Sequence, residues 1–363
     1  MNTYASNHGP VVAAHDAGHG HNKALLSPAM GEKKSWRYAS YVGQANDSQD
    51  DALRNNDVVR VQVDGVPFWT GTDAGFVLGP RATRNRDESY MHTPAYKALF
   101  LGTLWHFAQR SIDTLAVGLP NTTFRRYKDE LKGMLEGQHH VPDFSRGLRD
   151  YRQGEISVTV RDVIVCPQSY AAYVYASSMQ PSLGRGRVLV VEPGWNTLDT
   201  LIVEDGKPVP GTARPIEGSM GRVVQALQES MLSNIKQHSG TYNPRLITER
   251  DAEAALVAHY KQHASDAMVQ TAMGDQHVAD HLGAIDAAVN TALEPMFAEL
   301  SDHLPAITAV CVCGGGAPVF FEVLRKRLPL IRNIYVSGTP QFDVASGLLL
   351  VAQRASQASL QAA

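Results

Sequence analysis

An apolar strand that ends in a glycine-containing turn occurs three times in this chain, and in two of the three a second strand follows directly. The segments begin at residues 11–14, 187–191 and 309–313, and their turns read Asp16-Ala-Gly-His-Gly-His-Asn-Lys23, Glu192-Pro-Gly-Trp-Asn-Thr-Leu-Asp199 and Gly314-Gly-Gly-Ala317. Glycine lets main-chain N–H groups approach an anion closely, because no side chain intervenes. The repetition predicts a fold organised around turns that can bind phosphate.

Two of the turns also carry a carboxylate at the strand end, Asp16 and Glu192. A carboxylate is unsuited to face phosphates directly, but it can hold the water shell of a Mg²⁺ ion that bridges them. Lys23 could bring a cation to the same phosphates. Neither turn fits the P-loop or the dinucleotide pattern G-x-G-x-x-G. Any one turn taken alone would be read as an ordinary hairpin.

Length and composition limit the classes of protein to consider. A chain of 363 residues, of which 44% are hydrophobic and 19% charged, is expected to form two soluble globular domains. Its net charge of -3 gives no general attraction to nucleic acid or anionic lipid, so direct DNA wrapping is disfavoured. No apolar run approaches the roughly 20 residues of a membrane span, and no signal-peptide core is recognised, so a cytoplasmic protein is expected. The three cysteines are predicted to be buried, reduced thiols.

Hydrophobic periodicity predicts a mixed α/β chain. Alternation predicts a hairpin at residues 58–69 and one strand over residues 156–165 that leads to Pro167-Gln168. Three- and four-residue spacing predicts helices from residue 93 onward, at 124–135, 218–235, 252–263, 277–300 and 318–328.

The order of these motifs resembles that of a known superfamily. Asp16-x-Gly18-x-x-x-x-Lys23, Pro167-Gln168, Glu192-x-Gly194-x-x-Thr197-x-Asp199 and Gly314-Gly-Gly-Ala317 are similar to phosphate 1, connect 1, phosphate 2 and the adenosine motif of actins, sugar kinases and heat-shock chaperones. Within that superfamily the chain most resembles the ParM/StbA plasmid-segregation actins, including relatives encoded in PRTRC clusters. The finer similarities are Val61-Gln-Val-Asp-Gly65, Gly118-Leu-Pro120 and Pro340-x-Phe342-x-x-Ala345-x-Gly347.

The resemblance implies an actin-like α/β fold, with two related α/β domains flanking a nucleotide-binding cleft. Domain I would comprise residues 1–180, completed by 338–363, and domain II residues 181–337. Asp16 and Glu192 would hold the Mg²⁺ shell through water, and Gln168 would orient the attacking water, for which a neutral amide is chemically adequate. The positions that the resemblance assigns to binding ATP or ADP are Gly18, His19, Gly20, His21, Asn22, Lys23, Gly194, Trp195, Asn196, Thr197, Asp199, Gly314, Gly315, Gly316 and Ala317.

Several residues depart from the family pattern or admit another interpretation. Glu192 stands where phosphate 2 usually begins with aspartate, His19 replaces a hydroxyl residue, and Trp195 is bulky for a phosphate turn. Weak hydrolysis or an altered cleft could follow. The alternating histidines near Asp16 could suggest zinc, but no complete ligand set accompanies them. Asp199 fits a turn-capping role as well as a catalytic one, and Gln168 could serve only as a structural brace.

The function implied by the resemblance is a Mg-dependent ATPase that polymerises into filaments and separates plasmid DNA through a DNA-bound adaptor. Direct contact with nucleic acid or membrane is not expected. A small-molecule kinase of the same superfold is the main alternative, but it would need a general base for its acceptor that no second motif supplies. A nucleotide-binding scaffold or chaperone-like switch that never polymerises is the third interpretation.

Overall fold

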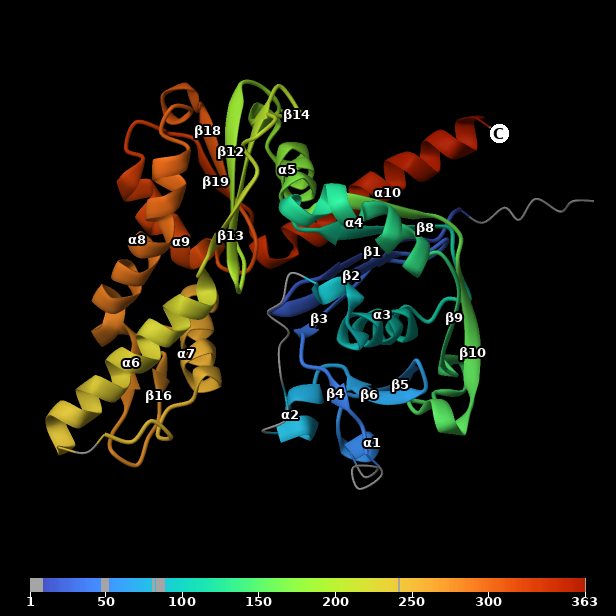
Figure 1. Ribbon diagram of the computed structural model, residues 1–363, viewed down its shortest axis with the longest axis horizontal. Coiled ribbons are helices and arrows are strands. Elements are labelled where there is room, and N and C mark those ends of the chain that lie inside the picture. Colours follow the sequence, from blue (N-terminus) through green and yellow to red (C-terminus); the bar gives the residue numbers. More distant parts are fainter. Residues whose placement is uncertain (1–8, 47–51, 80–81, 83–88, 241, 363) are drawn as a thin grey trace, which may run out of the picture. The chain divides into compact units, whose positions relative to one another are not determined.

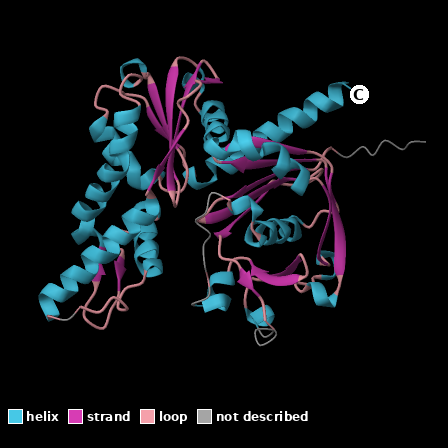
Figure 2. Cartoon of the chain, in the orientation of Figure 1, coloured by secondary structure: helices cyan, strands magenta, loops and turns pink. Residues whose placement is uncertain are grey.

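The structure is a computed structural model, and it describes residues 9–46, 52–79, 82, 89–240 and 242–362 (Figure 1). The chain divides into two compact units, Met1–Met179 with Phe342–Ala363 (unit 1) and Gln180–Gln341 (unit 2). Both units contain helices and strands (Figure 2). Among the residues described, no helix is long and apolar enough to span a bilayer.

Unit 1 contains most of the strands of the chain. They are β1 (Val12–Ala17), β2 (His21–Ser27), β3 (Lys34–Ala39), β4 (Gly43–Gln44), β5 (Val59–Val63), β6 (Val66–Thr70), β7 (Ser111–Ile112), β8 (Thr114–Leu119), β9 (Gly137–Pro142), β10 (Glu155–Val160) and β11 (Val163–Pro167). Its helices are α1 (Ala52–Asn55), α2 (Ala74–Leu78), α3 (Pro94–Phe107), α4 (Asn121–Leu135), α5 (Gln168–Met179) and α10 (Asp343–Ala362).

The main sheet of unit 1 has the order β11-β8-β1-β2-β3. β1, β8 and β11 are parallel, whereas β2 and β3 continue antiparallel from β1. All six residues of β8 are buried, as expected for a strand covered on both faces. α3 packs against one face of this sheet, and α5 and α10 cover the other (Figure 1).

Helices α5 and α10 lie in backbone contact, and small residues make this possible. A β-carbon added to Gly347 of α10 would lie 1.7 Å from the carbonyl oxygen of Ala171 of α5. Only glycine fits at that position. The C-terminal helix is thereby fixed against the helix that begins at Gln168.

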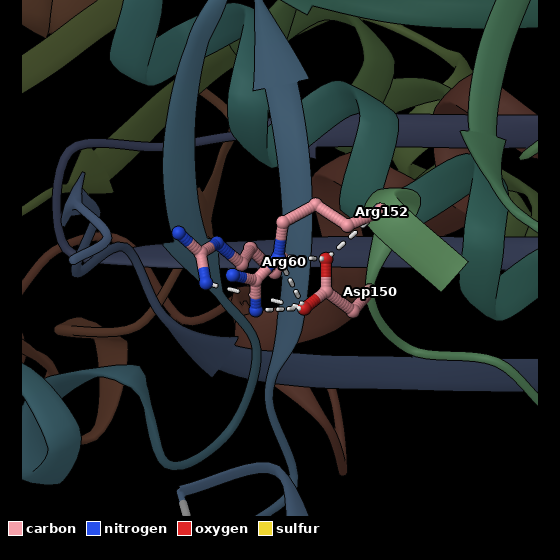
Figure 3. A network of polar contacts seen from close by, with 3 residues as sticks. All are labelled: Arg60, Asp150 and Arg152. Carbon is pink, nitrogen blue, oxygen red and sulfur yellow. Dashed lines mark hydrogen bonds and ion pairs between the residues drawn. The ribbon is translucent and has the colours of Figure 1, made fainter. Parts of the chain in front are cut away.

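A buried ion pair fixes the smaller β4-β6-β5 sheet of unit 1 (Figure 3). Arg60 of β5 is 2% exposed and Asp150 is 1% exposed, and Arg60 Nη1 lies 3.9 Å from Asp150 Oδ2. Arg152 approaches the same carboxylate more closely, with Nη2 at 2.5 Å from Oδ2. The Arg60 guanidinium also lies 5.5 Å from the centroid of the buried Trp69 ring. A charge removed from water in this way depends on its partner.

Unit 2 is built on one larger sheet of order β14-β13-β12-β18-β19, with β15 paired to β13. Its strands are β12 (Arg187–Pro193), β13 (Thr197–Glu204), β14 (Lys207–Pro208), β15 (Arg214–Glu217), β16 (Met268–Val269), β17 (Gln276–His277), β18 (Ala309–Val312) and β19 (Ile334–Val336). Its helices are α6 (Met220–Ser239), α7 (Glu249–Lys261), α8 (Leu282–Glu299) and α9 (Ala317–Arg327).

The two units repeat one strand topology. In unit 1 the antiparallel run β1-β2-β3 is extended by parallel β8 and β11, and in unit 2 the antiparallel run β12-β13-β14 is extended by parallel β18 and β19. The first hairpin pairs Asp16 with Lys23, and the second pairs Glu192 with Asp199. In each hairpin the two paired residues are seven positions apart in the sequence. This confirms the predicted fold class of related α/β domains.

Two predicted elements differ from the structure. The single strand expected over residues 156–165 is two strands, since β10 pairs with β9 and β7 while β11 pairs with β8. Between β10 and β11 the chain leaves one sheet and enters another. The alternation of apolar and polar residues continues through this bend, so the sequence does not reveal the change of sheet. The helix expected over residues 277–300 begins at Leu282, after a 3-10 turn at Val278–His281.

Candidate functional site

Strand alternation places neighbouring residues of β1 on opposite faces of the unit 1 sheet. His15 faces α3, and Asp16 faces the side covered by α5 and α10. The Asp16 side chain is 1% exposed, and its Oδ2 lies 2.7 Å from Nζ of Lys23, its partner across the hairpin. A buried carboxylate and an ammonium therefore lie together at the turn end of the first hairpin.

Gln168 reaches the same carboxylate from another part of the chain. β11 ends at Pro167, and α5 begins at Gln168. Because β1, β8 and β11 are parallel, their carboxyl ends meet at one edge of the sheet. Gln168 Nε2 donates a hydrogen bond of 2.8 Å to Asp16 Oδ1. One cluster is thus formed by Asp16, Lys23 and Gln168, although up to 152 positions separate them in the sequence.

The turn between β1 and β2 has its carbonyl groups bound on one side. Ser40 Oγ donates to the oxygen of Gly18 at 2.6 Å, and Ser40 N donates to the oxygen of Gly20 at 3.0 Å. These two acceptors are engaged within the protein, and the consecutive amide N–H groups of a glycine turn are of the type that binds anions. His19, at the tip, lies against Tyr90, with ring centroids 5.0 Å apart.

On the α3 face, His15 and Asn22 form a buried polar chain. His15 Nε2 lies 2.7 Å from Asn22 Oδ1, and Asn22 Nδ2 donates to Thr103 Oγ1 at 3.0 Å. Because the amide oxygen can only accept, the shared proton belongs to His15 Nε2. The Asn22 side chain is therefore engaged inside the protein, and its main chain lies within β2, which pairs with β1 on one side and β3 on the other. Burial lowers the pKa of His15 to about 4.

This shift predicts that His15 lowers stability in acid. The unfolded state takes up a proton below pH 6.5, whereas folded His15 resists protonation until its pKa of about 4, so stability is lost as the pH falls through this window. Between pH 7.5 and 5 we expect a loss of about 2 kcal/mol. Burial raises the pKa of Asp199 to about 6, and this shift increases the unfolding free energy as the pH falls, opposite to the effect of His15. The measurement is therefore the difference between wild type and His15→Gln in unfolding free energy at the two pH values. Equal pH dependence of the two proteins would contradict the prediction.

The β12–β13 hairpin of unit 2 repeats the geometry of the first. Gly194 N donates to Thr197 O at 2.8 Å and closes the turn. A β-carbon on Gly194 would lie 3.0 Å from that oxygen, and one on Gly18 would lie 3.1 Å from His21 O. Both turns are thus crowded at the same point, where a β-carbon would press on a main-chain oxygen.

The carbonyls of the second turn are bound by the first two amides of α6 and by the amide of Gly218, which lies just before the helix. Met220 N donates to Gly194 O at 3.1 Å, Gly221 N to Trp195 O at 2.9 Å, and Gly218 N to Asn196 O at 2.8 Å. As in the first hairpin, the acceptors of the turn are engaged within the protein. Trp195 packs on the start of α6, where a β-carbon on Gly221 would lie 3.2 Å from its main-chain oxygen and 3.6 Å from its ring nitrogen.

Asp199 lies beside Glu192 on one face of this hairpin, since the two are paired across it. Asp199 Oδ2 accepts a 2.7 Å hydrogen bond from Thr197 Oγ1. Burial raises the Asp199 pKa to about 6, and the Thr197 bond opposes this shift. Where the first hairpin pairs a carboxylate with an ammonium, the second pairs two carboxyl groups.

The glycine loop after β18 packs directly against the second hairpin. Gly314 has a φ of +79°, and a β-carbon there would lie 3.2 Å from Glu192 Cγ. One on Gly316 would lie 2.6 Å from Met220 Cγ and 2.8 Å from Pro193 Cβ. Gly316 is also the N-cap of α9, which Ala317 begins. Packing alone therefore requires two of these glycines.

Lys261 is a candidate that the sequence motifs did not indicate. It ends α7, and its Nζ lies 3.8 Å from the position of a β-carbon on Gly315. Among the described residues, no other atom beyond the neighbouring chain lies within 4 Å of that position. A cation on the last turn of an amphipathic helix is usually a solvent-facing residue, so its place beside the glycine loop follows only from the tertiary fold.

No group of three or more His, Cys, Asp or Glu side chains that could hold a metal occurs in the described part of the chain, and the described cysteines are free and buried. Mg²⁺ is typically held by one or two carboxylates, with waters and substrate phosphates completing its shell. Asp16 of unit 1 and Glu192 of unit 2 each supply one carboxylate, and their assignment to Mg²⁺ stays a prediction.

This arrangement of strands, with a carboxylate and a glycine turn on the first hairpin of each unit, defines the actin-like fold. Residues 14–170 match the family described as "Actin like proteins N terminal domain". The chain accordingly has an actin-like fold, and its residues 14–170 are similar to that domain family.

Solved structures agree over almost the whole chain. Ta0583, an archaeal actin homolog, has a TM-score of 0.72 at 18% identity, with 95% of this chain and 99% of that chain covered; it has also been solved in complex with ADP. A 15-stranded ParM filament from Clostridium botulinum gives 0.67 at 14% identity, covering 95% and 99%. Actin-like protein Alp7A gives 0.70 at 13% identity, covering 97% and 98%. No match is found among curated proteins.

Proposed function

We propose that this protein binds and hydrolyses Mg-ATP and that the bound nucleotide controls its assembly into filaments. The observation that carries the proposal is the cluster in which one buried carboxylate, Asp16, accepts from both Lys23 and Gln168. Such a cluster at the end of a glycine turn combines a metal-shell ligand, a phosphate-binding cation and a water-orienting amide. The ADP complex of Ta0583 and the ParM filament support the same function.

Each residue has a distinct role in this proposal. Mg²⁺, when bound, would neutralise phosphate charge, with Asp16 and Glu192 holding its water shell. Lys23 would contact phosphate from the first hairpin, and the turn amides would bind phosphate oxygens. The bond from Gln168 Nε2 to Asp16 holds the amide in place, so that its oxygen can accept a hydrogen bond from the attacking water.

The cellular role that we propose is segregation of plasmid DNA through a DNA-bound adaptor protein in the cytoplasm. The net charge of -3 supports an indirect link to DNA rather than direct binding. Filaments would then supply movement, and the adaptor would supply the contact with DNA.

Sedimentation and light scattering of the purified protein test this function. We expect polymer with ATP and Mg²⁺ and with a non-hydrolysable ATP analogue, and disassembly as ADP accumulates. A protein that stays monomeric over a wide concentration range while it phosphorylates a sugar or a carboxylic acid would be a kinase instead. A protein that hydrolyses ATP slowly without polymer would be a nucleotide-dependent switch.

A further inference from the structure

The contact between Gln168 and Asp16 has to cross an intervening strand. In the sheet order β11-β8-β1, β8 lies between the strand that leads to Gln168 and the strand that carries Asp16. The Gln168 side chain nevertheless bonds to Asp16 at 2.8 Å. It must therefore pass over β8 on the face covered by α5 and α10.

The residue of β8 beneath this crossing is Gly118. Gly118 pairs with Cys166 of β11, and its neighbour Val117 pairs with His15 of β1. A β-carbon on Gly118 would lie 2.8 Å from Gln168 Cγ and 3.5 Å from Gln168 Nε2. The first distance is shorter than real carbon contacts allow, and Cγ is near the root of the side chain, so the whole Gln168 side chain would have to move.

We infer that Gly118 is a positioning residue for the proposed hydrolysis: its missing side chain gives Gln168 the path by which it reaches Asp16. No positive φ explains glycine at this position, since Gly118 is an ordinary strand residue. Glycine inside a strand often marks a place where another group approaches closely. Here the approaching group is the amide that we assign to orienting water, so the inference rests on the proposed function.

The test is Gly118→Ala, compared with Gly133→Ala. Gly133 lies on α4, where an added β-carbon meets nothing within 4 Å, so it is a matched glycine substitution without a clash. We expect Gly118→Ala to lower kcat for ATP between about tenfold and 10²-fold with KM unchanged, because orientation of the nucleophile is lost and nucleotide binding is not. Gly133→Ala should match wild type.

A double variant separates positioning from general packing. A β-carbon on Gly118 would also lie 3.4 Å from Leu348 Cδ1, so a purely structural role is possible in principle. If Gly118 acts through Gln168, adding Gly118→Ala to Gln168→Ala should lower kcat no further, because the clashing side chain has gone. An equal loss in both backgrounds, or wild-type kcat in Gly118→Ala, would overturn the inference.

A spectroscopic measurement keeps this result distinct from failure of the proposed function. The side-chain amide resonances of Gln168, assigned by their absence in Gln168→Ala, should shift in nucleotide-free Gly118→Ala and stay in place in Gly133→Ala. If wild type does not hydrolyse ATP, the proposed function fails, and the amide resonances still decide whether Gly118 positions Gln168. Unshifted resonances in Gly118→Ala would overturn the positioning role.

Discussion

Asp150→Ala should destabilise unit 1 by about 3–5 kcal/mol, the cost typical of leaving one member of a buried ion pair without its partner. Arg60 is 2% exposed and cannot reach water without disturbing β5, so its charge would remain inside the protein. Asp150 also accepts from Arg152 N at 3.0 Å and caps a 3-10 turn, which adds to the loss. Chemical unfolding of wild type and variant measures the effect.

Two further variants assign the effect to the buried charge. Arg152→Ala removes the partner whose side chain is 35% exposed, and we expect a loss of no more than about 1 kcal/mol. Arg60→Met combined with Asp150→Ala removes both buried charges and should be more stable than Asp150→Ala alone. If Asp150→Ala and Arg152→Ala proved equally mild, the ion pair would not be what fixes the small sheet.

Gln168→Ala should lower ATP hydrolysis by on the order of 10²-fold while nucleotide binding stays nearly intact. The amide bonds to Asp16 Oδ1, whereas Lys23 bonds to Oδ2, so its removal leaves the ion pair in place. Phosphate release under single-turnover conditions and nucleotide titration measure the two quantities separately. Filaments should still assemble with ATP, and their disassembly should slow because conversion to ADP is delayed.

The control for this variant is Gln225→Ala, which removes an exposed amide that bonds to Glu229 in α6. It should hydrolyse ATP as wild type does. If Gln168 is only a structural brace, its removal should lower thermal stability and nucleotide affinity together. Wild-type phosphate release by folded Gln168→Ala would remove Gln168 from the mechanism.

The sequence predicted the fold well because the features that define it are local. Each hairpin needs an apolar strand, a glycine turn and a second strand, and all three can be seen within a dozen residues of Asp16 or Glu192. The buried stripe of α6, Val223, Leu227, Met231 and Ile235, is likewise visible in its spacing. Local patterns of this kind predict structure well because a strand or an amphipathic helix buries the same apolar face that its residue spacing indicates.

Features that depend on distant residues were not predictable. Arg60 and Asp150 lie 90 positions apart, and nothing in either segment marks the other as a partner for a buried charge. Lys261 resembles any basic residue at a helix end. Gly118 appeared only as part of a family-like motif, and the reason for a glycine there is the side chain of Gln168, which comes from the start of α5. The roles of the candidate residues in nucleotide binding stay predictions.

The unlike charges of the two hairpins have a consequence for what the protein can sense. The first pairs the carboxylate of Asp16 with the ammonium of Lys23, whereas the second pairs the carboxyl groups of Glu192 and Asp199 with each other. A triphosphate at the second hairpin would meet two acidic groups, and a divalent cation between them would attract the phosphates instead. If the proposed function holds, the free magnesium concentration acts as a second input beside ATP. Filament assembly would then depend on the product of the ATP and free Mg²⁺ concentrations, and a fall in either concentration would disassemble the polymer.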